Sequence, residues 1–273
     1  TLLEAEDHLA YHASGRSAAM FLESYGNRTI RALNEASADH HRAGGVLTPR
    51  PFLLIGKAGQ AGAFTAEAES FGAIPIGIAE AQDHFPLLDP SVIAHAALRG
   101  DTSDLDTDRL VQAARRMALA NGARIVPGAR VTALTRDHGW HAATAAGAFR
   151  ATTLVNAAGA WADDIARLAG IAPLGLTPLR RSMARLPLPE GLDPSAWPFV
   201  DALGESWYAK PDAGCLIVSP AEEDPSEPMD AWADDMVIAE GLARFEEMVS
   251  LSVTRLLATW AGLRTFAPDR TLV

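Results

Sequence analysis

Residues 152–166 read TTLVNAAGAWADDIA, a short apolar strand that runs into a series of small residues. Asn156, Ala157, Ala158 and Gly159 carry little side-chain bulk, so the backbone here can approach a flat ligand closely. We expect Gly159 to need a special backbone angle, which glycine adopts at little cost. Residues 161–170 then predict a short helix that ends at Gly170. The segment therefore predicts a strand, a ligand-contacting turn and a helix.

The rest of the chain alternates between strand and helix patterns before a strand-rich middle section. The clearest helix spans residues 106–122, with acidic residues in its first turn, apolar positions at helical spacing and Gly122 as its end. We also predict a hairpin over residues 206–220 that turns at residues 211–214. Further helices are predicted over 17–41 (broken near Gly26) and 236–250, and further strands over 1–4, 52–56, 123–126, 131–136, 139–144 and 176–186.

This alternation favours an α/β fold, in which a discontinuous Rossmann-like domain carries an inserted mixed β-sheet domain. We assign residues 1–47, 101–171 and 260–273 to the nucleotide-binding domain. Residues 48–100 and 172–259 form the inserted substrate domain. No internal repeat or low-complexity tract interrupts either part.

Composition excludes several classes of function. The 273 residues carry 23 basic and 34 acidic side chains, a net charge of −11, which argues against a nucleic-acid partner. No apolar run is long enough to predict a membrane span. The single Cys215 rules out an internal disulfide or a cysteine-based zinc site, and it suits the cytoplasm. No metal site is predicted, because the His40–His41 pair lacks carboxylates at ligand spacing.

The opening residues suggest a nucleotide site. Glu4 follows Leu2 and Leu3 at the carboxyl end of a predicted strand, where an acidic side chain can accept hydrogen bonds from both hydroxyls of a ribose. Ser14 or Ser17 can cap the helix predicted to follow, and its free N–H groups beside Arg16 favour an anion. The glycine fingerprint that should precede Glu4 is not present, and GKAGQAG at residues 56–62 lacks its spacing.

Five segments in this order resemble the family of FAD-dependent amine and D-amino-acid oxidoreductases, with greatest similarity to the bacterial D-arginine dehydrogenase type. They are LLEAE at 2–6, YHASGRSAA at 11–19, VNAAGAWAD at 155–163, SWYAKPDAG at 206–214 and WAGLR at 260–264. The resemblance implies FAD as cofactor and a sheet domain covering the flavin. It also implies that the chain is an internal fragment, without the first glycine-loop strand and the closing flavin-contacting segment.

The resemblance implies roles for individual residues. Arg181 and Arg264 would hold the substrate carboxylate, and Tyr25 and Tyr208 would place hydroxyls at the substrate or an ordered water. Arginine suits this task because its planar fork binds a carboxylate in two places. Arg180 would point to the other face of its strand. The implied cofactor contacts are Glu4, Ser14, Gly15, Arg16, Ser17, Val131, Asn156, Ala157, Gly159, Trp161 and Gly262.

Two positions depart from the arginine-preferring members of the family. Phe52 stands where they carry an acid for the cationic side chain, so we predict an apolar D-amino acid as substrate in preference to D-arginine or D-lysine. Met20 replaces a histidine near the substrate amine, which predicts a pH profile shifted upward. The electron acceptor is a quinone or oxygen, and peripheral attachment to an inner membrane stays open.

Two other hypotheses remain from the sequence. One is an oxidase of secondary amines of the sarcosine or glycine type, which shares the flavin architecture. The other is a non-catalytic fragment that cannot bind FAD.

Overall fold

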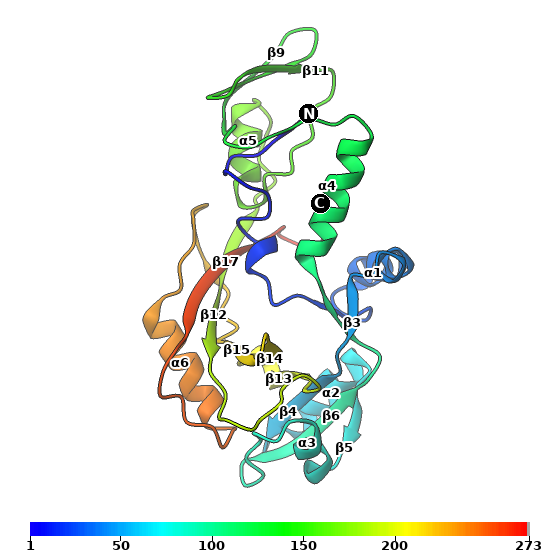
Figure 1. Ribbon diagram of the computed structural model, residues 1–273, viewed down its shortest axis with the longest axis vertical. Helices are drawn as coiled ribbons and strands as arrows, with labels where there is room; N and C mark the ends of the chain where they lie inside the picture. Colours follow the sequence, from blue (N-terminus) through cyan, green and yellow to red (C-terminus); the bar gives the residue numbers. More distant parts are fainter. Residues whose placement is uncertain (272–273) are drawn as a thin grey trace.

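The computed structural model describes residues 1–271 and confirms an α/β fold with a large mixed sheet. Figure 1 shows most of this sheet in the lower part of the molecule, with β9 (Val131–Arg136), β11 (Gly147–Ala151) and helix α4 (Thr107–Ala120) above it and β3 (Leu47–Pro49) beside it. Strands β12 (Thr177–Leu186) and β17 (Ala258–Phe266) run from the large sheet toward the upper part. The two parts therefore meet along this pair of strands.

The large sheet has nine strands, eight of which follow the order β16-β12-β15-β14-β13-β4-β6-β5, while β17 pairs with β12. All of its pairings are antiparallel except that of β13 with β4. The remaining strand bounds are β4 (Phe52–Lys57), β5 (Ile74–Ile76), β6 (Ile93–Arg99), β13 (Phe199–Ala202), β14 (Tyr208–Asp212), β15 (Cys215–Ser219) and β16 (Asp224–Pro225).

Strand alternation gives this sheet two different faces. Leu53 and Ile55 of β4 lie in the main core with Phe85, Trp207 and Phe245, beneath helices α3 (Ile78–His84) and α6 (Asp235–Glu246). Phe52 and Leu54 point to the opposite face and pack with helix α2 (Ala61–Phe71). Because successive side chains of a strand point to opposite faces, one strand serves both layers, and the Phe52 face also borders a cavity.

Three smaller sheets complete the fold. β1 (Leu2–Leu3) pairs in parallel with β8 (Ile125–Val126). β2 (Met20–Phe21), β7 (Ser103–Leu105) and β3 (Leu47–Pro49) form a second sheet, and β11 (Gly147–Ala151), β10 (Trp140–Thr144) and β9 (Val131–Arg136) form a third. The other helices are α1 (Arg28–Ala43), α4 (Thr107–Ala120) and α5 (Ala162–Leu168), with short 3₁₀ turns η1 (Ser14–Arg16), η2 (Gly159–Trp161) and η3 (Leu203–Glu205).

Local chemistry explains most element boundaries. Asn27, Asp106 and Asp234 each cap a helix by accepting backbone N–H bonds with their side chains. The predicted hairpin forms between β14 and β15, where Ala213 and Gly214 have φ angles of 48° and 78°. Positive φ at both turn positions matches the twist of a two-residue hairpin.

Two predicted elements differ in the structure. The helix expected from Ser17 is absent from that point, because Met20 and Phe21 extend along β7 and the helix begins only after its Asn27 cap. Residues 152–158 form no strand, and Val155 is 80% exposed, because no neighbouring strand among residues 1–271 pairs with them.

The structure adds a connection that bears on the domain boundaries. β17 pairs along its whole length with β12, from Phe266 opposite Thr177 to Ala258 opposite Arg185. Residues 260–266, which the sequence assigned to the nucleotide-binding domain, are thus hydrogen-bonded into the large sheet.

Within residues 1–271, no helix has the length and apolar character needed to cross a membrane.

Candidate active site

A cavity of about 360 Å³ lies between the segment that leads into α1 and one face of the large sheet. Its walls come from β4, β12, β13, β14 and β17, together with the η1–β2 segment. The cavity brings together all six residues predicted to contact substrate: Met20, Tyr25, Phe52, Arg181, Tyr208 and Arg264.

The two arginines are placed by neighbouring antiparallel strands. Arg181 lies opposite Gly262, and Arg264 follows two residues later on β17. Since alternate residues share a face, both guanidinium groups point to the cavity. The side chain of Arg181 is only 5% exposed, whereas that of Arg264 is 36% exposed. The pair therefore combines a buried cation with a more accessible one.

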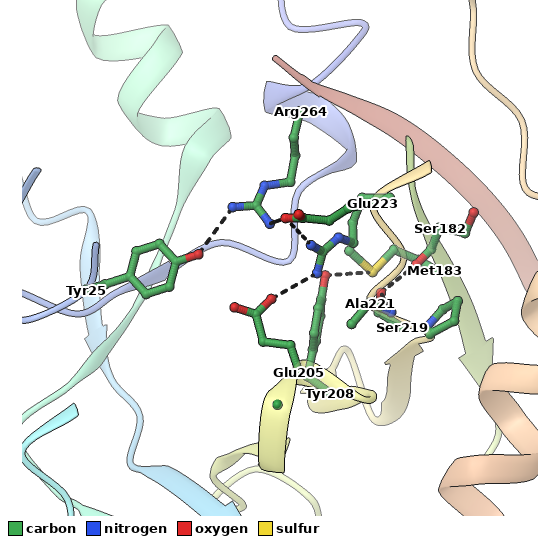
Figure 2. A network of polar contacts seen from close by, with 12 residues as sticks. Tyr25, Ser182, Met183, Glu205, Tyr208, Ser219, Ala221, Glu223 and Arg264 are labelled. Atoms are coloured by element: carbon green, nitrogen blue, oxygen red, sulfur yellow. Dashed lines mark hydrogen bonds and ion pairs between the residues drawn. The ribbon is translucent and has the colours of Figure 1, made fainter. Parts of the chain in front are cut away.

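Acidic side chains hold these cations in place (Figure 2). Arg181 Nη2 lies 3.2 Å from Glu223 Oε1, and Arg181 Nη1 lies 3.4 Å from Glu205 Oε2. Glu223 also lies 3.8 Å from Arg264 and bonds Arg270. Burial opposes ionisation of Glu223, but the three arginines, Arg270 first, lower its pKa below the ordinary value. Glu223 is therefore an ionised link between both cavity arginines.

The two tyrosines have different surroundings. Arg264 Nη2 donates to the Tyr25 hydroxyl at 3.3 Å, and Tyr25 is 39% exposed. Tyr208 is half-buried, and its hydroxyl donates to Met183 Sδ at 3.7 Å. The Arg181 guanidinium lies 5.8 Å from the centre of the Tyr208 ring. Burial raises the pKa of Tyr208, although Arg181 opposes the shift, so this hydroxyl is a neutral donor.

Aromatic rings form the apolar wall. Phe52 stacks on Phe199 with a centroid distance of 6.1 Å, and Phe199 stacks on Tyr208 at 5.1 Å. Phe52 is 3% exposed and is paired in register with Phe199. Met20 packs against the same cluster. This wall can contact the carbon skeleton of a small substrate.

The sequence reasoning missed two acids in this cavity, Asp201 of β13 and Glu205 of η3. Asp201 is 5% exposed, and its register partner on β14 is Tyr208. Burial, reinforced by Glu205 and Glu67, raises the pKa of Asp201 well above its ordinary value, and Arg181 opposes this only in part. The available signal was an acid inside the apolar stretch Phe199–Ala202.

Arg180 lies on the strand face that was predicted for it. Arg180 turns away from the cavity and pairs with Asp224 at 3.4 Å, as strand alternation predicts. Among residues 1–271, no group of three or more His, Cys, Asp or Glu side chains is arranged to hold a metal ion.

The residues predicted to contact a cofactor divide into two groups. Arg16, Ser17 and Gly262 line the cavity itself, with Ser14 and Gly15 in the adjoining turn η1. Gly15 is required there, because a Cβ atom would lie 2.1 Å from the Ala10 carbonyl oxygen. Outside the cavity wall lie Glu4, Val131, Asn156, Ala157, Gly159 and Trp161.

In the first group, the structure differs from the predicted helix start at Ser14 or Ser17. η1 is a single 3₁₀ turn with no side-chain cap, so it presents no helix start for an anion at Ser14 or Ser17. The Arg16 side chain instead fastens the loop internally. It donates to the carbonyl oxygens of Tyr11, Ala231 and Ala261 and pairs with Asp230 at 2.5 Å. The Arg16 guanidinium is therefore engaged within the protein, and so is its backbone, whose N–H donates to Ala13 and whose carbonyl oxygen accepts from Trp260 Nε1.

The second group keeps the predicted positions. Glu4 follows β1 at the carboxyl end of a parallel strand pair, and its Oε1 accepts the Glu6 N–H at 3.0 Å. Gly159 has a φ angle of +54°, which confirms the expected special angle. Within residues 1–271, nothing apart from its chain neighbours lies within 4 Å of a Cβ placed on Gly159, so this backbone is open to a ligand. The Asn156 side chain is engaged with the Ala162 carbonyl oxygen.

Comparison with protein families decides the class. The model described as "DAO: FAD dependent oxidoreductase" matches residues 1–273. The chain belongs to this family. Among curated proteins, the hydrogen cyanide synthase subunit HcnC of Pseudomonas aeruginosa is 27% identical to this chain over 165 residues. That match spans 59% of this chain and 38% of the subunit.

Solved structures share the fold of this chain. Glycine oxidase from Geobacillus kaustophilus superposes with a TM-score of 0.81 at 18% identity, covering 98% of this chain and 76% of that one. The FAD-bound L-α-glycerophosphate oxidase from Mycoplasma pneumoniae gives 0.82 at 16% identity, covering 98% and 77%. Iminodiacetate oxidase from Chelativorans sp. BNC1 gives 0.74 at 18% identity, covering 96% and 76%.

The residues present fit the family's cofactor. An acid closes a parallel strand at Glu4, and the uncovered backbone at Gly159 leaves room for a flat group. Gly262 and the small residues Ser17, Ala18 and Ala19 line the cavity without filling it. Small side chains and exposed backbone are what close approach to a ring system requires. These positions are the ones that would hold FAD.

Proposed function

We propose that this oxidoreductase oxidises the Cα–N bond of a D-amino acid to the imino acid. The observation that carries the proposal is the convergence of Arg181, Arg264, Tyr25 and Tyr208 on one cavity. Two cations beside two hydroxyls suit a substrate that carries a carboxylate next to the reacting carbon. A non-catalytic fragment of such an enzyme would keep the same convergence, so binding of FAD is what separates the two alternatives.

The arginines would position the substrate. Arg181 is fixed by Glu205 and Glu223, so its fork is oriented before a ligand arrives. Arg264 reaches the same cavity from the adjoining strand and is steadied by the Tyr25 hydroxyl. A carboxylate bound by both would keep its Cα in one orientation, and such positioning supplies much of the rate enhancement in reactions of this type.

Bound FAD would supply the oxidant, accepting the hydride that leaves Cα while the amine nitrogen gives up a proton to solvent. This chain contributes the surfaces on either side of that reaction. Gly262, Ser17 and the neighbouring small residues leave space on one side, and the aromatic wall of Phe52, Phe199 and Tyr208 excludes water on the other. Met20 cannot accept the amine proton, so the substrate must enter with a neutral amine, which supports a pH profile shifted upward.

The test is anaerobic addition of single amino acids to the chain reconstituted with FAD, followed by visible absorption. Bleaching of the flavin bands by D-amino acids, with loss of the response in Arg181→Lys and Arg264→Lys, is the expected result. Flavin that stays oxidised with every amino acid would overturn the proposal. Failure to retain any FAD would instead support the non-catalytic fragment.

Oxidation of a secondary amine is a second candidate. Similarity to proteins named glycine oxidase and iminodiacetate oxidase favours it. The same experiment separates the two, because sarcosine and iminodiacetate would then reduce the flavin while D-amino acids would not. Reoxidation by oxygen or by a quinone in a second step would identify the electron acceptor.

Substrate preference depends on two opposing features of the cavity. Phe52 supports the apolar preference predicted from the sequence, since its ring cannot pair with a cation. The acids Asp201 and Glu205 line the same cavity and would favour a cation when ionised, although burial raises the pKa of Asp201 and Glu205 already pairs with Arg181.

A further inference from the structure

Glu222 carries a buried carboxyl group that has no role in the steps above, and it immediately precedes Glu223 in the chain. Both of its carboxyl oxygens are shielded from solvent and lack a hydrogen-bond partner among residues 1–271. An ionised carboxylate is very costly to bury without a partner, whereas the neutral acid is much less so. Glu222 can therefore keep this position at low cost only while it carries a proton.

Glu222 begins a run of three acids that lies antiparallel to β12. Asp224 of β16 is the register partner of Arg180, and the two side chains form an ion pair at 3.4 Å. The next pair along the same register is Glu223 with Arg181, whose charged groups lie 3.2 Å apart. Ion pairs between the two strands thus hold two of the three acids.

One residue further along this register, Glu222 meets a serine in place of an arginine. Ser182 points to the sheet face opposite the cavity, and its hydroxyl is fully buried without a hydrogen-bond partner in the described part of the chain. Burial raises the pKa of Glu222 above its ordinary value, and the nearby Ser182 and Arg181 oppose this shift only in part. The third acid is therefore the one whose charge is not compensated.

The cations on the elements around Glu222 are engaged elsewhere. Arg180 pairs with Asp224, and the ion pairs of Arg181 go to two other acids. Arg244 of α6 donates to two backbone carbonyl oxygens. An ionised Glu222 would therefore gain stability by moving out to solvent rather than by finding a new partner in place.

We propose that Glu222 is a positioning residue, which holds segment 221–225 against β12 while it is protonated and releases this segment when it ionises. The segment includes Glu223, the acid shared by Arg181 and Arg264. Its release leaves both guanidinium groups without their common partner, so they are no longer oriented before a ligand arrives. The release is a property of the fold, and only its effect on substrate rests on the proposed function.

Hydrogen exchange measured by mass spectrometry follows the release directly and needs no substrate. At the end of the segment, the Ser226 N–H donates to the Pro178 carbonyl oxygen at 3.0 Å and reports on docking. Release frees one proton from Glu222, so its equilibrium constant should rise by up to about tenfold per pH unit. Glu222→Gln keeps the shape but cannot ionise, and its exchange should lack this acceleration when compared with the parent at each pH.

Two further variants keep the exchange test decisive. Glu227→Gln alters an exposed acid of the same loop, and it should exchange like the parent at every pH. If Glu222→Gln does not fold, Glu222→Met serves instead, because it also removes the charge at similar volume. The same pH dependence of exchange in the parent and in the Glu222 variant would overturn the proposal.

A simple carboxylate separates this proposal from the proposed function. Propionate has no amine to titrate, and calorimetric titration measures its binding to the 273-residue chain. The affinity of the parent should fall about tenfold from about pH 6 to about pH 9 as the docked fraction falls, whereas Glu222→Gln should stay within about twofold. Asp201 and Tyr208 are the same in both proteins, so their ionisation cancels in the comparison.

The two measurements together assign each possible failure. Exchange that depends on Glu222, without any binding of propionate, supports the positioning of segment 221–225 and removes the carboxylate site. Propionate binding with the same pH profile in the parent and in Glu222→Gln keeps the carboxylate site and overturns the link between Glu222 and the arginines.

Discussion

The hydroxyl of Tyr25 accepts a hydrogen bond from Arg264 Nη2 at 3.3 Å, which joins a loop near the N-terminus to strand β17, 239 residues away. The loop contributes a hydroxyl to the cavity, and the strand contributes a guanidinium. This contact, together with the bond from Arg16 to the Ala261 carbonyl oxygen, ties the loop side of the candidate site to β17.

Replacing Tyr25 with Phe should weaken substrate binding while leaving the fold intact. The ring is 39% exposed, so only the hydroxyl contact is lost. A net hydrogen-bond contribution of about 0.5–1.5 kcal/mol predicts a three- to tenfold rise in KM. Steady-state kinetics of Tyr25→Phe measure this, with Tyr11→Phe as control because its hydroxyl bonds Asp230 outside the cavity. An unchanged KM would remove Tyr25 from the site.

Replacing Arg181 with Lys should reduce kcat/KM much more than Tyr25→Phe does. Lysine keeps the charge but not the planar fork that meets Glu205, Glu223 and a substrate carboxylate together. We expect kcat/KM to fall about ten- to hundredfold, with most of the effect in KM. Arg180→Lys, one residue away on the opposite face, should stay within about twofold. Equal losses in the two variants would indicate general damage to β12 rather than a lost carboxylate contact.

Asp201 should make the protein less stable as the pH rises. Burial first, then Glu205 and Glu67, raise its pKa above the ordinary 3.8, while Arg181 opposes the shift; Tyr208, its neighbour across the strands, stays neutral. The folded state therefore keeps a proton that the unfolded state has lost. The resulting stability is complete below the unfolded pKa and disappears as the pH rises through the folded pKa.

Asp201→Asn should accordingly raise the Tm at pH 8 and change it little at pH 4. For a chain of this length, each kcal/mol gained corresponds to a shift of roughly 2–4 °C. Differential scanning calorimetry at both pH values, with Asp224→Asn as control, measures the difference. A variant that is less stable than the parent at pH 8 would show that the Asp201 carboxylate is satisfied in the folded protein.

The stability that Asp163 contributes should depend on pH in the opposite direction. Burial disfavours its charge, but the backbone N–H groups of Leu174, Leu176 and Gly175 donate to it and lower its pKa. Its contribution to stability is present above the unfolded pKa of about 3.8 and is lost as the pH falls through the folded pKa. Asp163→Asn should cost about 1–3 kcal/mol at pH 7.

The adjacent Asp164 provides the control for that experiment. It pairs with Arg167 on an exposed helix face, where an ion pair contributes about 0.3–0.5 kcal/mol. The free energies of unfolding of Asp163→Asn and Asp164→Asn, measured by urea denaturation at pH 7, should therefore differ by at least about 0.5 kcal/mol. Similar midpoints for the two variants would contradict a special role for the three backbone contacts.

Local sequence patterns predicted the elements that are stabilised by contacts between residues close together in the chain. The helix over 106–122 appears as α4 with its Asp106 cap, and the hairpin turns at Ala213 and Gly214 as expected. Gly159 has the predicted positive φ. Arg181 and Arg264 come together because their strands pair, a relation that the family resemblance implied and that side-chain alternation makes consistent.

Features that depend on distant pairing could not be predicted in the same way. β13 lies parallel to β4, which brings Asp201 beside Leu54 across 147 residues of sequence. No periodicity in either segment encodes that neighbour, so the acid in the cavity went unnoticed. The helix expected at Ser17 failed for the same reason, since pairing of Met20 and Phe21 with β7 overrides local helix preference.

Different strands of the large sheet carry different parts of the candidate site. β12 and β17 carry the arginines, and their register is fixed by nine residue pairs. β4 and β13 carry Phe52, Phe199 and Asp201, and they face the cavity from the other side of two intervening strands. Under the proposed function, a substitution on β4 or β13 can therefore change which substrate side chain is accepted, while the arginines on β12 and β17 keep their contact with the carboxylate that all amino acids share.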